Sequence, residues 1–292
     1  NGAVLVDLSS YHLDVFLLIK SDGTALYQTK DLALAQKKYD SFDIDESWHV
    51  VDVRQTHYFR QLFKTLQLNG FDKKLVHVPY EFVTLPEGAM SSRKGNVVLY
   101  GNLMQDALLK ARQETKKRHS DWKTSKVHKV ARTIAHAAIK FSMLKHENIQ
   151  VITFELDKAL SFEGDTGPYL LYTYARACSL LRKAGTEFGV PVPNFQEVDF
   201  LVYNTKYEHE LLALISQWLM VVQKAGKEQK PSLVATYLLQ LAHVFNELYH
   251  HVPVLHHGAR EDVIARVYLV KRFSVLFKRM MTLLNIRLID EM

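Results

Sequence analysis

The strongest constraint on the fold is a change in the spacing of apolar residues about one third of the way along the chain. Before residue 100, short apolar runs of strand character alternate with stretches of helical spacing. From residue 103 to the end, apolar residues recur at the three- and four-residue intervals of amphipathic helices. This change predicts an α/β domain over residues 1–102 and an all-α helical domain over residues 103–292.

The first domain is predicted to hold part of a Rossmann-type parallel sheet, because its strands and helices alternate. The expected strands are Val4–Leu8, Val15–Lys20, Trp48–Val53 and Leu75–Val78, and the expected helices are Asp31–Tyr39 and His57–Gly70. The second domain is predicted to be a bundle of the helices Leu103–His119, Lys126–Lys145, Tyr169–Lys183, Glu208–Ala225, Ser232–Tyr249 and Glu261–Leu284. The fold class is therefore α/β with a partial parallel sheet, followed by an all-α bundle.

The composition fits a polyanionic partner without requiring one. Lys and Arg number 37 against 31 Asp and Glu, and the net charge is +6. The single cysteine, Cys178, has no partner for a disulfide or a zinc site, so no metal site is expected. No apolar run reaches the roughly 18 residues that span a bilayer, and no signal peptide opens the chain. We expect a soluble, cytoplasmic protein with no membrane partner, cut from a longer one.

The segment Glu87–Tyr100, EGAMSSRKGNVVLY, has the chemistry of a phosphate-binding loop. Small residues let the backbone approach a phosphate, hydroxyls and amides donate hydrogen bonds to it, and Arg93 and Lys94 supply positive charge. Such a loop can stabilise the charge that builds on a pyrophosphate in a transition state. A basic surface turn is the alternative that composition leaves open.

Tyr27 and Asp31 are four residues apart, near a predicted helix start. If the helix begins there, both side chains project from one face. A carboxylate accepts two hydrogen bonds from a guanidinium group, and a phenol adds a further bond or a stacking surface. The alternative is an aspartate that stabilises the start of a helix through the macrodipole.

The segment Phe162–Lys183 predicts a helix capped by Asp165 or Thr166. That helix presents Tyr172 and Arg176 on neighbouring turns. Aromatic rings with an interleaved arginine suit unstacked RNA bases, which stack on rings and are read by the guanidinium group. A buried aromatic stripe is the competing interpretation.

A basic segment precedes that helix. Residues Lys110 to Lys145 include eleven Lys or Arg and two acidic residues. Contacts to nucleic-acid phosphates need such a face, and their contribution falls steeply with salt. A solvated helix surface is the alternative.

Several of these runs resemble the arginyl-tRNA synthetases, a family of class I aminoacyl-tRNA synthetases. MSSRKGN at Met90–Asn96 resembles the family's variant of the Lys-Met-Ser-Lys-Ser signature, with Ala89 at the first lysine. The run KSDGTALYQTKDLA, the run EGDTGPYL with its following Tyr and Arg, and the ending LLNIRLIDEM are similar to segments of that family, in the same order. The resemblance extends over nearly the whole chain.

The resemblance implies roles for particular residues. In the loop it implies catalytic roles for Met90, Ser91, Ser92, Arg93 and Lys94, with ATP bound by Met90, Ser91 and Lys94. It implies contacts to substrate arginine by Tyr27, Asp31 and Gln55, and leaves open whether His57 or Tyr58 faces the adenine side. It implies contacts to the tRNA anticodon by Tyr172, Arg176, Phe245, Tyr249 and Met292.

The activity that the resemblance implies is ATP-dependent activation of arginine, followed by transfer to tRNA(Arg), with Mg²⁺ accompanying the ATP. The family's His-Ile-Gly-His-like signature has no match here. The chain is therefore expected to lack the N-terminal nucleotide-binding half, which becomes its expected partner, and to be inactive alone. One alternative is a non-catalytic RNA-binding module or paralogue. The other, a cysteinyl-type synthetase, needs zinc ligands that one cysteine cannot supply.

Overall fold

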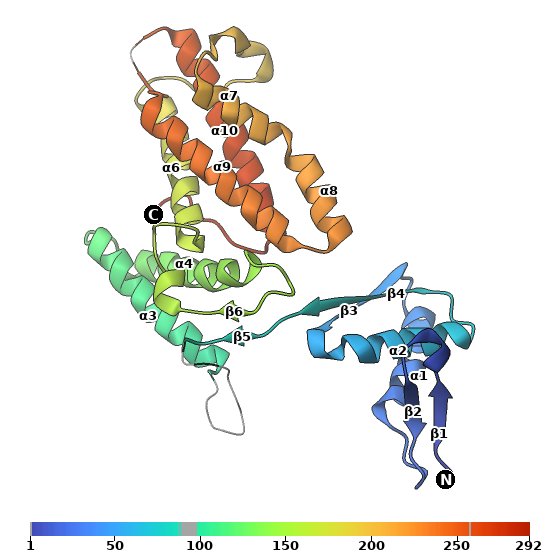
Figure 1. Cartoon of the computed structure of the whole chain (residues 1–292). Coiled ribbons are helices and arrows are strands. Elements are labelled where there is room, and N and C mark those ends of the chain that lie inside the picture. The colour runs from blue at the N-terminus through green and yellow to red at the C-terminus, as the bar shows by residue number, and fades with distance from the viewer. Residues whose placement is uncertain (1, 87, 89–97, 257) are drawn as a thin grey trace. The chain divides into compact units, whose positions relative to one another are not determined.

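A computed structural model of the chain describes residues 2–86, 88, 98–256 and 258–292 (Figure 1). It divides into two compact units. The first unit comprises Asn1–Phe82 and Asn148–Val151, and the second comprises Val83–Glu147 and Ile152–Met292. The division of the sequence at residues 102 and 103 remains a prediction about domains.

The elements follow the predicted order, but the predicted helix Glu208–Ala225 is divided into two helices, and the two short strands of the second unit were not predicted. In the first unit they are β1 (Val4–Asp7), η1 (Ser9–Tyr11), β2 (Val15–Ile19), α1 (Tyr27–Ser41), β3 (Glu46–Asp52), η2 (Val53–Gln55), α2 (Thr56–Leu68) and β4 (Lys74–Tyr80). In the second unit they are β5 (Val83–Thr84), α3 (Tyr100–Arg118), α4 (Thr124–Leu144), β6 (Ile152–Thr153), α5 (Leu156–Ala159), α6 (Gly167–Thr186), η4 (Phe195–Glu197), η5 (Phe200–Val202), α7 (Lys206–Ser216), α8 (Trp218–Glu228), α9 (Pro231–His251) and α10 (Arg260–Leu283).

The strands of the first unit form two separate pairs. β1 and β2 pair antiparallel, with Asp7 opposite Val15, whereas β3 and β4 pair parallel, with Glu46 opposite Lys74. The predicted partial parallel sheet is confirmed in β3 and β4, whereas β1 and β2 form a separate antiparallel pair outside it. Only seven residues separate β1 from β2, and a parallel connection needs a crossover of about a dozen or more. Helix α2 supplies that crossover between β3 and β4.

The core of the first unit lies between the hairpin and helices α1 and α2. Its buried members are Leu8, Leu13, Phe16, Ala35, Phe59, Leu62 and Leu66. One face of β3 remains uncovered by described residues, because Trp48 is 49% exposed and Val50 is 63% exposed. Parallel sheets are usually covered on both faces, so this face has the character of a packing surface.

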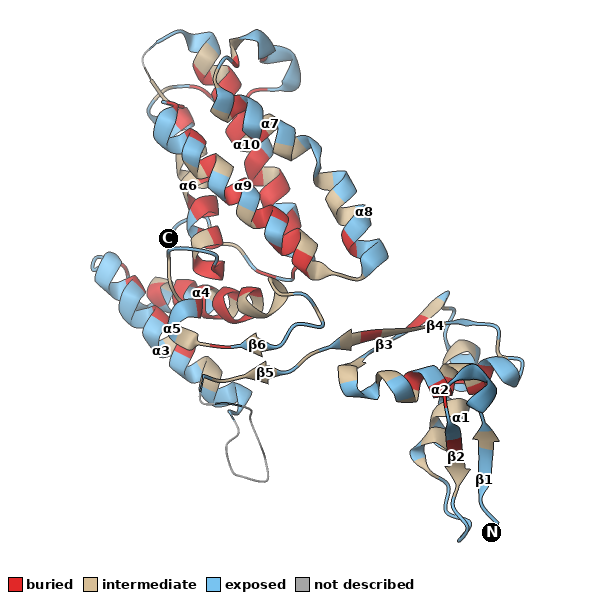
Figure 2. Cartoon of the chain, viewed as in Figure 1, coloured by how far each residue is buried: buried red, intermediate tan, exposed pale blue. Residues whose placement is uncertain are grey.

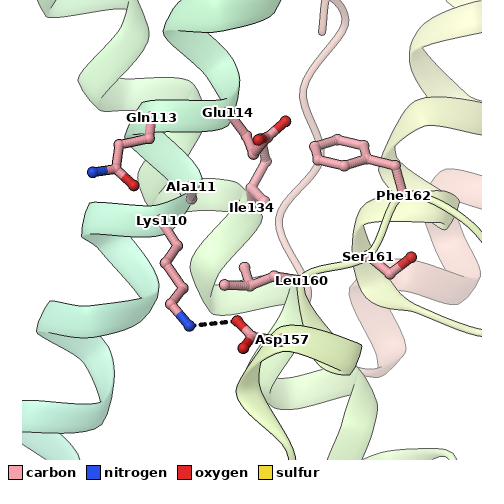
Figure 3. Close-up of a pocket in the computed structure, with 9 residues that line it drawn as sticks. All are labelled: Lys110, Ala111, Gln113, Glu114, Ile134, Asp157, Leu160, Ser161 and Phe162. Atoms are coloured by element: carbon pink, nitrogen blue, oxygen red, sulfur yellow. Dashed lines mark hydrogen bonds and ion pairs between the residues drawn. The ribbon is translucent and has the colours of Figure 1, made fainter.

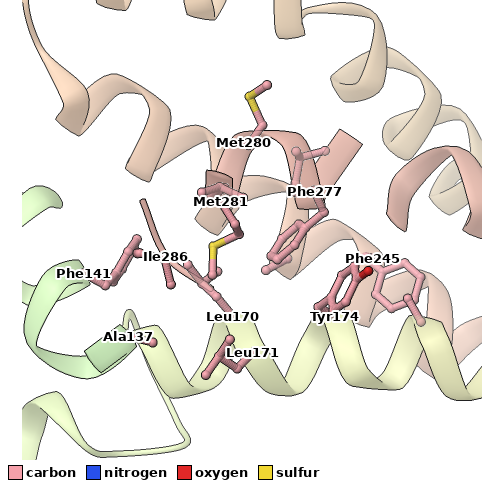
Figure 4. Close-up of a cluster of buried hydrophobic side chains, with 14 of the residues drawn as sticks. Ala137, Phe141, Leu170, Leu171, Tyr174, Phe245, Phe277, Met280, Met281 and Ile286 are labelled. Carbon is pink, nitrogen blue, oxygen red and sulfur yellow. The ribbon is translucent and has the colours of Figure 1, made fainter. Parts of the chain in front are cut away.

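The second unit is a helical bundle whose buried side chains come mainly from α4, α6, α9 and α10 (Figure 2). Helix α6 packs against α4 and α10, and α9 packs against α7 and α8. Figure 4 shows the centre of this core, where side chains of α4, α6, α9 and α10 meet. The all-α bundle predicted for this region is confirmed. None of the described helices is both long enough and apolar enough to cross a membrane.

The start of α6 is determined by a cap and a close approach. The Thr166 hydroxyl accepts a hydrogen bond from the Tyr169 N–H at 3.2 Å, which confirms Thr166 as one of the two predicted caps. Gly167, the first residue of the helix, lies directly against α4. A Cβ atom at this position would stand 2.3 Å from the carbonyl oxygen of Ala137. Only glycine lets the two helices meet so closely.

A buried ion pair joins α7 to α10 within the bundle. The carboxylate of Glu208, at the start of α7, is fully buried and accepts from the Arg266 Nε of α10 at 2.9 Å. It also accepts from the Thr205 N–H at 2.9 Å and from the Thr205 hydroxyl at 2.7 Å. Burial acts to raise the pKa of Glu208, but Arg266 and Thr205 outweigh it and lower that pKa below its ordinary value.

Candidate functional site

Two candidate sites emerge, one in each unit. The first is the Asp31 niche, formed by Tyr27, Asp31 and Tyr58. Helix α1 begins at Tyr27, so Asp31 stands one turn further on the same face. Tyr58 of α2 donates a hydrogen bond to the Asp31 Oδ2, and its ring lies 5.2 Å from that of Tyr27. Asp31 forms no ion pair with any residue that the structure describes.

The chemistry of the niche is that of an acceptor with aromatic walls. Burial and the hydrogen bond to Asp31 raise the pKa of Tyr58 above its ordinary value, so its hydroxyl stays protonated and donates. The carboxylate is thereby oriented, and because each of its oxygens has two lone pairs, both can still accept from a ligand. Tyr27 is 61% exposed. A half-buried carboxylate that one phenol orients, with a second aromatic ring beside that phenol, suits a planar cation such as guanidinium.

Gln55 and His57 lie close to Tyr58 in sequence, but neither of them belongs to the Asp31 niche as defined above. Gln55 is exposed and ends the short turn η2 just before α2. Its proposed contact with arginine is not tested by any interaction in the structure. His57 lies 3.7 Å from Asp14, whereas Tyr58 belongs to the Asp31 niche. Which of His57 and Tyr58 faces ATP stays a prediction.

The residues predicted to carry catalysis and ATP binding, Met90, Ser91, Ser92, Arg93 and Lys94, lie outside the described residues. The described chain continues from Val98, and α3 begins at Tyr100.

The second candidate site is the Arg176 cluster, formed by Tyr172 and Arg176 of α6 and by Asn246 and Tyr249 of α9. The guanidinium carbon of Arg176 lies 4.8 Å from the ring centre of Tyr172 and 4.4 Å from that of Tyr249. Both tyrosines are 38% exposed. Arg176 also donates to the Asn246 Oδ1 at 2.5 Å and to the Tyr172 hydroxyl at 3.2 Å. The cluster is a partly exposed surface of two rings around a held cation, and not a sealed core.

Sequence reasoning did not select Asn246 for this site. Its signal was present, because Asn246 lies three residues before Tyr249 and so shares a helical face with it. Phe245, four residues before Tyr249, was selected instead. The structure corrects that expectation: Phe245 has no exposed surface and stacks on Phe273 at 4.0 Å between ring centres. Its ring contributes to the core shown in Figure 4 and has no face to offer to a base.

The C-terminal residue is half-buried against the helical core. Met292 follows Glu291, whose carboxylate pairs with Lys126 of α4 at 2.6 Å. This ion pair ties the end of the chain to the bundle. The contact of Met292 with an anticodon remains a prediction.

Some cations of the basic segment form ion pairs: Lys110 pairs with Asp157, and Lys126 pairs with Glu291. Other cations lie near His136 of α4: Arg132 and Lys140 of the same helix, and Arg287 near the end of the chain. Burial lowers the pKa of His136, and the nearby charges of Arg132, Lys140 and Arg287 lower it further. Helix α4 itself contains no acidic residue. This surface has the sign of charge that nucleic-acid phosphates require.

A pocket of about 340 Å³ opens elsewhere in the second unit (Figure 3). Residues of α3, α4, α5 and the segment just after α5 line it, and two of them, Lys110 and Asp157, form an ion pair. None of the residues proposed for arginine or anticodon contact lines this pocket. It is therefore separate from both candidate sites.

Comparison with known proteins places both units in one family. Residues 1–156 match the family model described as "tRNA synthetases class I (R), catalytic domain". Residues 170–292 match the model described as "DALR anticodon binding domain". The two matches follow each other along the chain and together cover most of it.

Curated relatives and solved structures agree. The arginine–tRNA ligase of Bdellovibrio bacteriovorus is 37% identical over 91% of this chain and 45% of its own length. That of Ligilactobacillus salivarius is 34% identical over 100% of this chain and 50% of its own length. The structure of Thermus thermophilus arginyl-tRNA synthetase matches with a TM-score of 0.85 and 30% identity, over 100% of this chain and 54% of the other.

The chain thus spans about half the length of the curated relatives it matches. The matched catalytic-domain model covers more than half of the chain, from residue 1 to residue 156. On these grounds the chain belongs to the arginyl-tRNA synthetase family of class I aminoacyl-tRNA synthetases.

Proposed function

We propose that the chain is part of an arginine–tRNA ligase, which activates arginine with ATP and then transfers it to tRNA(Arg). The single observation that carries this proposal is the Asp31 carboxylate, which accepts from Tyr58 and forms no ion pair with a described residue, next to the adjoining rings of Tyr58 and Tyr27. A guanidinium group can donate two parallel hydrogen bonds to a carboxylate, and an ammonium group cannot match that geometry. The niche therefore favours arginine over lysine.

Activation of arginine needs positioning and charge stabilisation more than a protein nucleophile. In the proposed reaction, the carboxylate of arginine attacks the α-phosphate of ATP, an aminoacyl-adenylate forms, and pyrophosphate leaves. Asp31 and the tyrosines hold the side chain of arginine, and Gln55 adds a contact. The loop residues Met90–Lys94 are proposed to stabilise the departing pyrophosphate, and Mg²⁺ is expected to accompany the ATP phosphates.

Transfer requires that the enzyme hold tRNA(Arg). We propose that the Arg176 cluster contacts the anticodon loop, with bases stacking on Tyr172 and Tyr249 and the guanidinium of Arg176 donating to a base edge. Its support is the exposure of both rings and the position of the cation between them. Met292 is kept as a further candidate contact. The cations around His136 support contacts to phosphates.

The uncovered face of β3 is proposed to pack against a further part of the catalytic domain. Trp48 and Val50 are large apolar residues with about half or more of their surface exposed. A patch of this kind on a parallel sheet marks a contact with other polypeptide. We expect the 292-residue chain by itself to bind tRNA but not to catalyse arginine-dependent exchange of pyrophosphate into ATP. Exchange by the purified chain would overturn that expectation.

A second candidate function is an RNA-binding module without catalysis. The observation that favours it is the completeness of the Arg176 cluster within the second unit alone. Aminoacylation by the full-length gene product separates the two functions, because a module without catalysis charges no tRNA.

The arginine assignment is tested by Asp31→Asn in the full-length gene product. The variant removes the charge-assisted hydrogen bonds proposed between the Asp31 carboxylate and the guanidinium group of arginine. We therefore expect the KM for arginine to rise at least about tenfold. The KM for ATP should change much less. The matched control is Asp14→Asn, which removes a nearby exposed carboxylate that pairs with His57. An unchanged KM for arginine in Asp31→Asn, or an equal rise in the control, would exclude the proposed niche.

A further inference from the structure

We infer that Asn246 is the positioning residue of the Arg176 cluster, holding the guanidinium of Arg176 in the slot between Tyr172 and Tyr249 before RNA arrives. This inference rests on the proposed function of the cluster as an anticodon-binding surface. Asn246 differs from the proposed contact residues Tyr172, Arg176 and Tyr249, because it affects RNA binding through its hold on Arg176.

The side-chain amide of Asn246 can adopt only one orientation in this setting. Arg176 is a donor only, so the Asn246 oxygen must face it, as the 2.5 Å contact shows. The Asn246 nitrogen then donates to the Tyr169 hydroxyl at 2.9 Å and to the Thr173 hydroxyl at 3.0 Å. Thr173 can accept because its own proton goes to the Tyr169 carbonyl at 3.0 Å. All three partners of the amide thus belong to α6, and Asn246 reaches them from α9.

The hydrogen bonds continue beyond Asn246 in one direction. The Tyr169 hydroxyl also lies 3.2 Å from the His243 Nδ1, and it donates to that nitrogen when His243 is in the Nε2–H tautomer. Burial raises the pKa of Tyr169, which keeps that proton in place. The other nitrogen of His243 lies 3.4 Å from the Asp165 carboxylate. In that tautomer, donation runs from Arg176 through Asn246, Tyr169 and His243 to Asp165.

The consequence for Arg176 is a restricted side chain. An arginine side chain loses rotamer entropy when it is ordered, and a residue ordered before binding avoids that loss at the moment of binding. Within the described structure, two of its five N–H groups donate to Asn246 and Tyr172. The remaining N–H groups can donate to a base. Asn246 therefore determines how Arg176 is presented.

The test measures binding of the 292-residue chain to a fluorescein-labelled RNA hairpin that carries an arginine anticodon loop. A hairpin with the same stem and a scrambled loop reports contacts to phosphates alone. Asn246→Leu keeps the size of the side chain and removes both ends of the amide. We expect it to weaken binding of the arginine hairpin about three- to tenfold, the range for one immobilised side chain. Binding of the scrambled hairpin should change less than about twofold.

A double-mutant cycle with Arg176→Gln separates positioning from a general loss of structure. If Asn246 acts through Arg176, the double variant should bind no more weakly than Arg176→Gln alone. Tyr203→Phe is the control for stability, since it removes a hydrogen bond to the Ala265 carbonyl in the same unit, at 2.7 Å, far along the chain from the cluster. It should leave both hairpins bound as by the parent chain.

The outcomes distinguish the two levels of the proposal. If the parent chain binds both hairpins equally, the proposed anticodon function fails. If the parent discriminates and Asn246→Leu discriminates as well, the positioning role fails and the proposed function stands. Additive losses in the double variant would also overturn the inference, because they would show that Asn246 acts independently of Arg176.

Discussion

Replacing Glu208 by Gln is expected to destabilise the helical unit strongly. The substitution keeps the shape of the side chain and removes its charge. Arg266, whose side chain is 9% exposed, would then be a buried cation without a counter-ion. In one orientation the glutamine oxygen would accept from Arg266, and the amide nitrogen would face the N–H and O–H groups of Thr205. In the other orientation the oxygen would accept from Thr205, and the amide nitrogen would face the guanidinium group.

The magnitude follows from this geometry. Breaking a buried ion pair by removing one partner costs about 3–5 kcal/mol. A domain is stable by only about 5–15 kcal/mol, so the variant should lose a large share of its stability. By contrast, Glu208→Gln combined with Arg266→Met removes both charges. The double variant should recover more than half of the unfolding free energy lost by Glu208→Gln, because replacing a buried ion pair by apolar packing often changes stability little.

Urea unfolding followed by tryptophan fluorescence can assign the loss to the correct unit. Trp122 and Trp218 lie in the helical unit, and a Trp48→Phe background removes the signal of the first unit. The midpoint should fall at an unchanged slope if only stability has changed. The role assigned to the ion pair would be refuted if Glu208→Gln lost less than about 1 kcal/mol of unfolding free energy, or if the double variant were less stable than the single one.

Two further predictions concern the same unit. Because the pKa of Glu208 is lowered in the folded state, its contribution to stability is full above the ordinary carboxyl value of 4.5 and is lost as the pH falls through the folded-state pKa. The urea midpoint should therefore fall more steeply with decreasing pH in the parent chain than in Glu208→Gln. Equal falls in both would contradict this link between the pKa of Glu208 and stability. Gly167→Ala should destabilise by about 1–3 kcal/mol, because its Cβ would collide with the Ala137 carbonyl. Its control, Gly185→Ala in the same helix, meets no atom within 4 Å and should raise the midpoint, so a fall in both variants would point to another cause.

Much of the fold was predictable from local signals. Apolar spacing predicted most helices of the second unit, although it joined α7 and α8 into one, and the predicted Asp165 or Thr166 cap indicated where α6 begins. The strand segments were found, but their pairing was not. The first two strands pair antiparallel because their connection is too short for a crossover, a constraint that connection length alone could have revealed.

The candidate sites were predictable only in part, because each combines residues from distant segments. Asp31 and Tyr27 share a helical face, which spacing reveals, but Tyr58 reaches them from another helix. The same holds for Arg176, whose partner Asn246 lies 70 residues further on. Spacing along one helix cannot identify a partner on another.

By itself, the sequence determined which segments become helices and strands, and which side chains share a face of one helix. The family resemblance carried by its motifs was also present in the sequence, and the comparisons confirmed it. These features depend on neighbours a few residues apart, where backbone geometry sets the spacing.

Only the tertiary structure decided between Phe245 and Asn246. Both lie close to Tyr249 on the helical face, so spacing does not separate them. Packing against Phe273 buries the apolar ring, and the donors and acceptors of α6 satisfy the neighbouring amide. The physical reason is that an apolar ring gains by leaving water, whereas a buried amide is stable only where all its partners are in place.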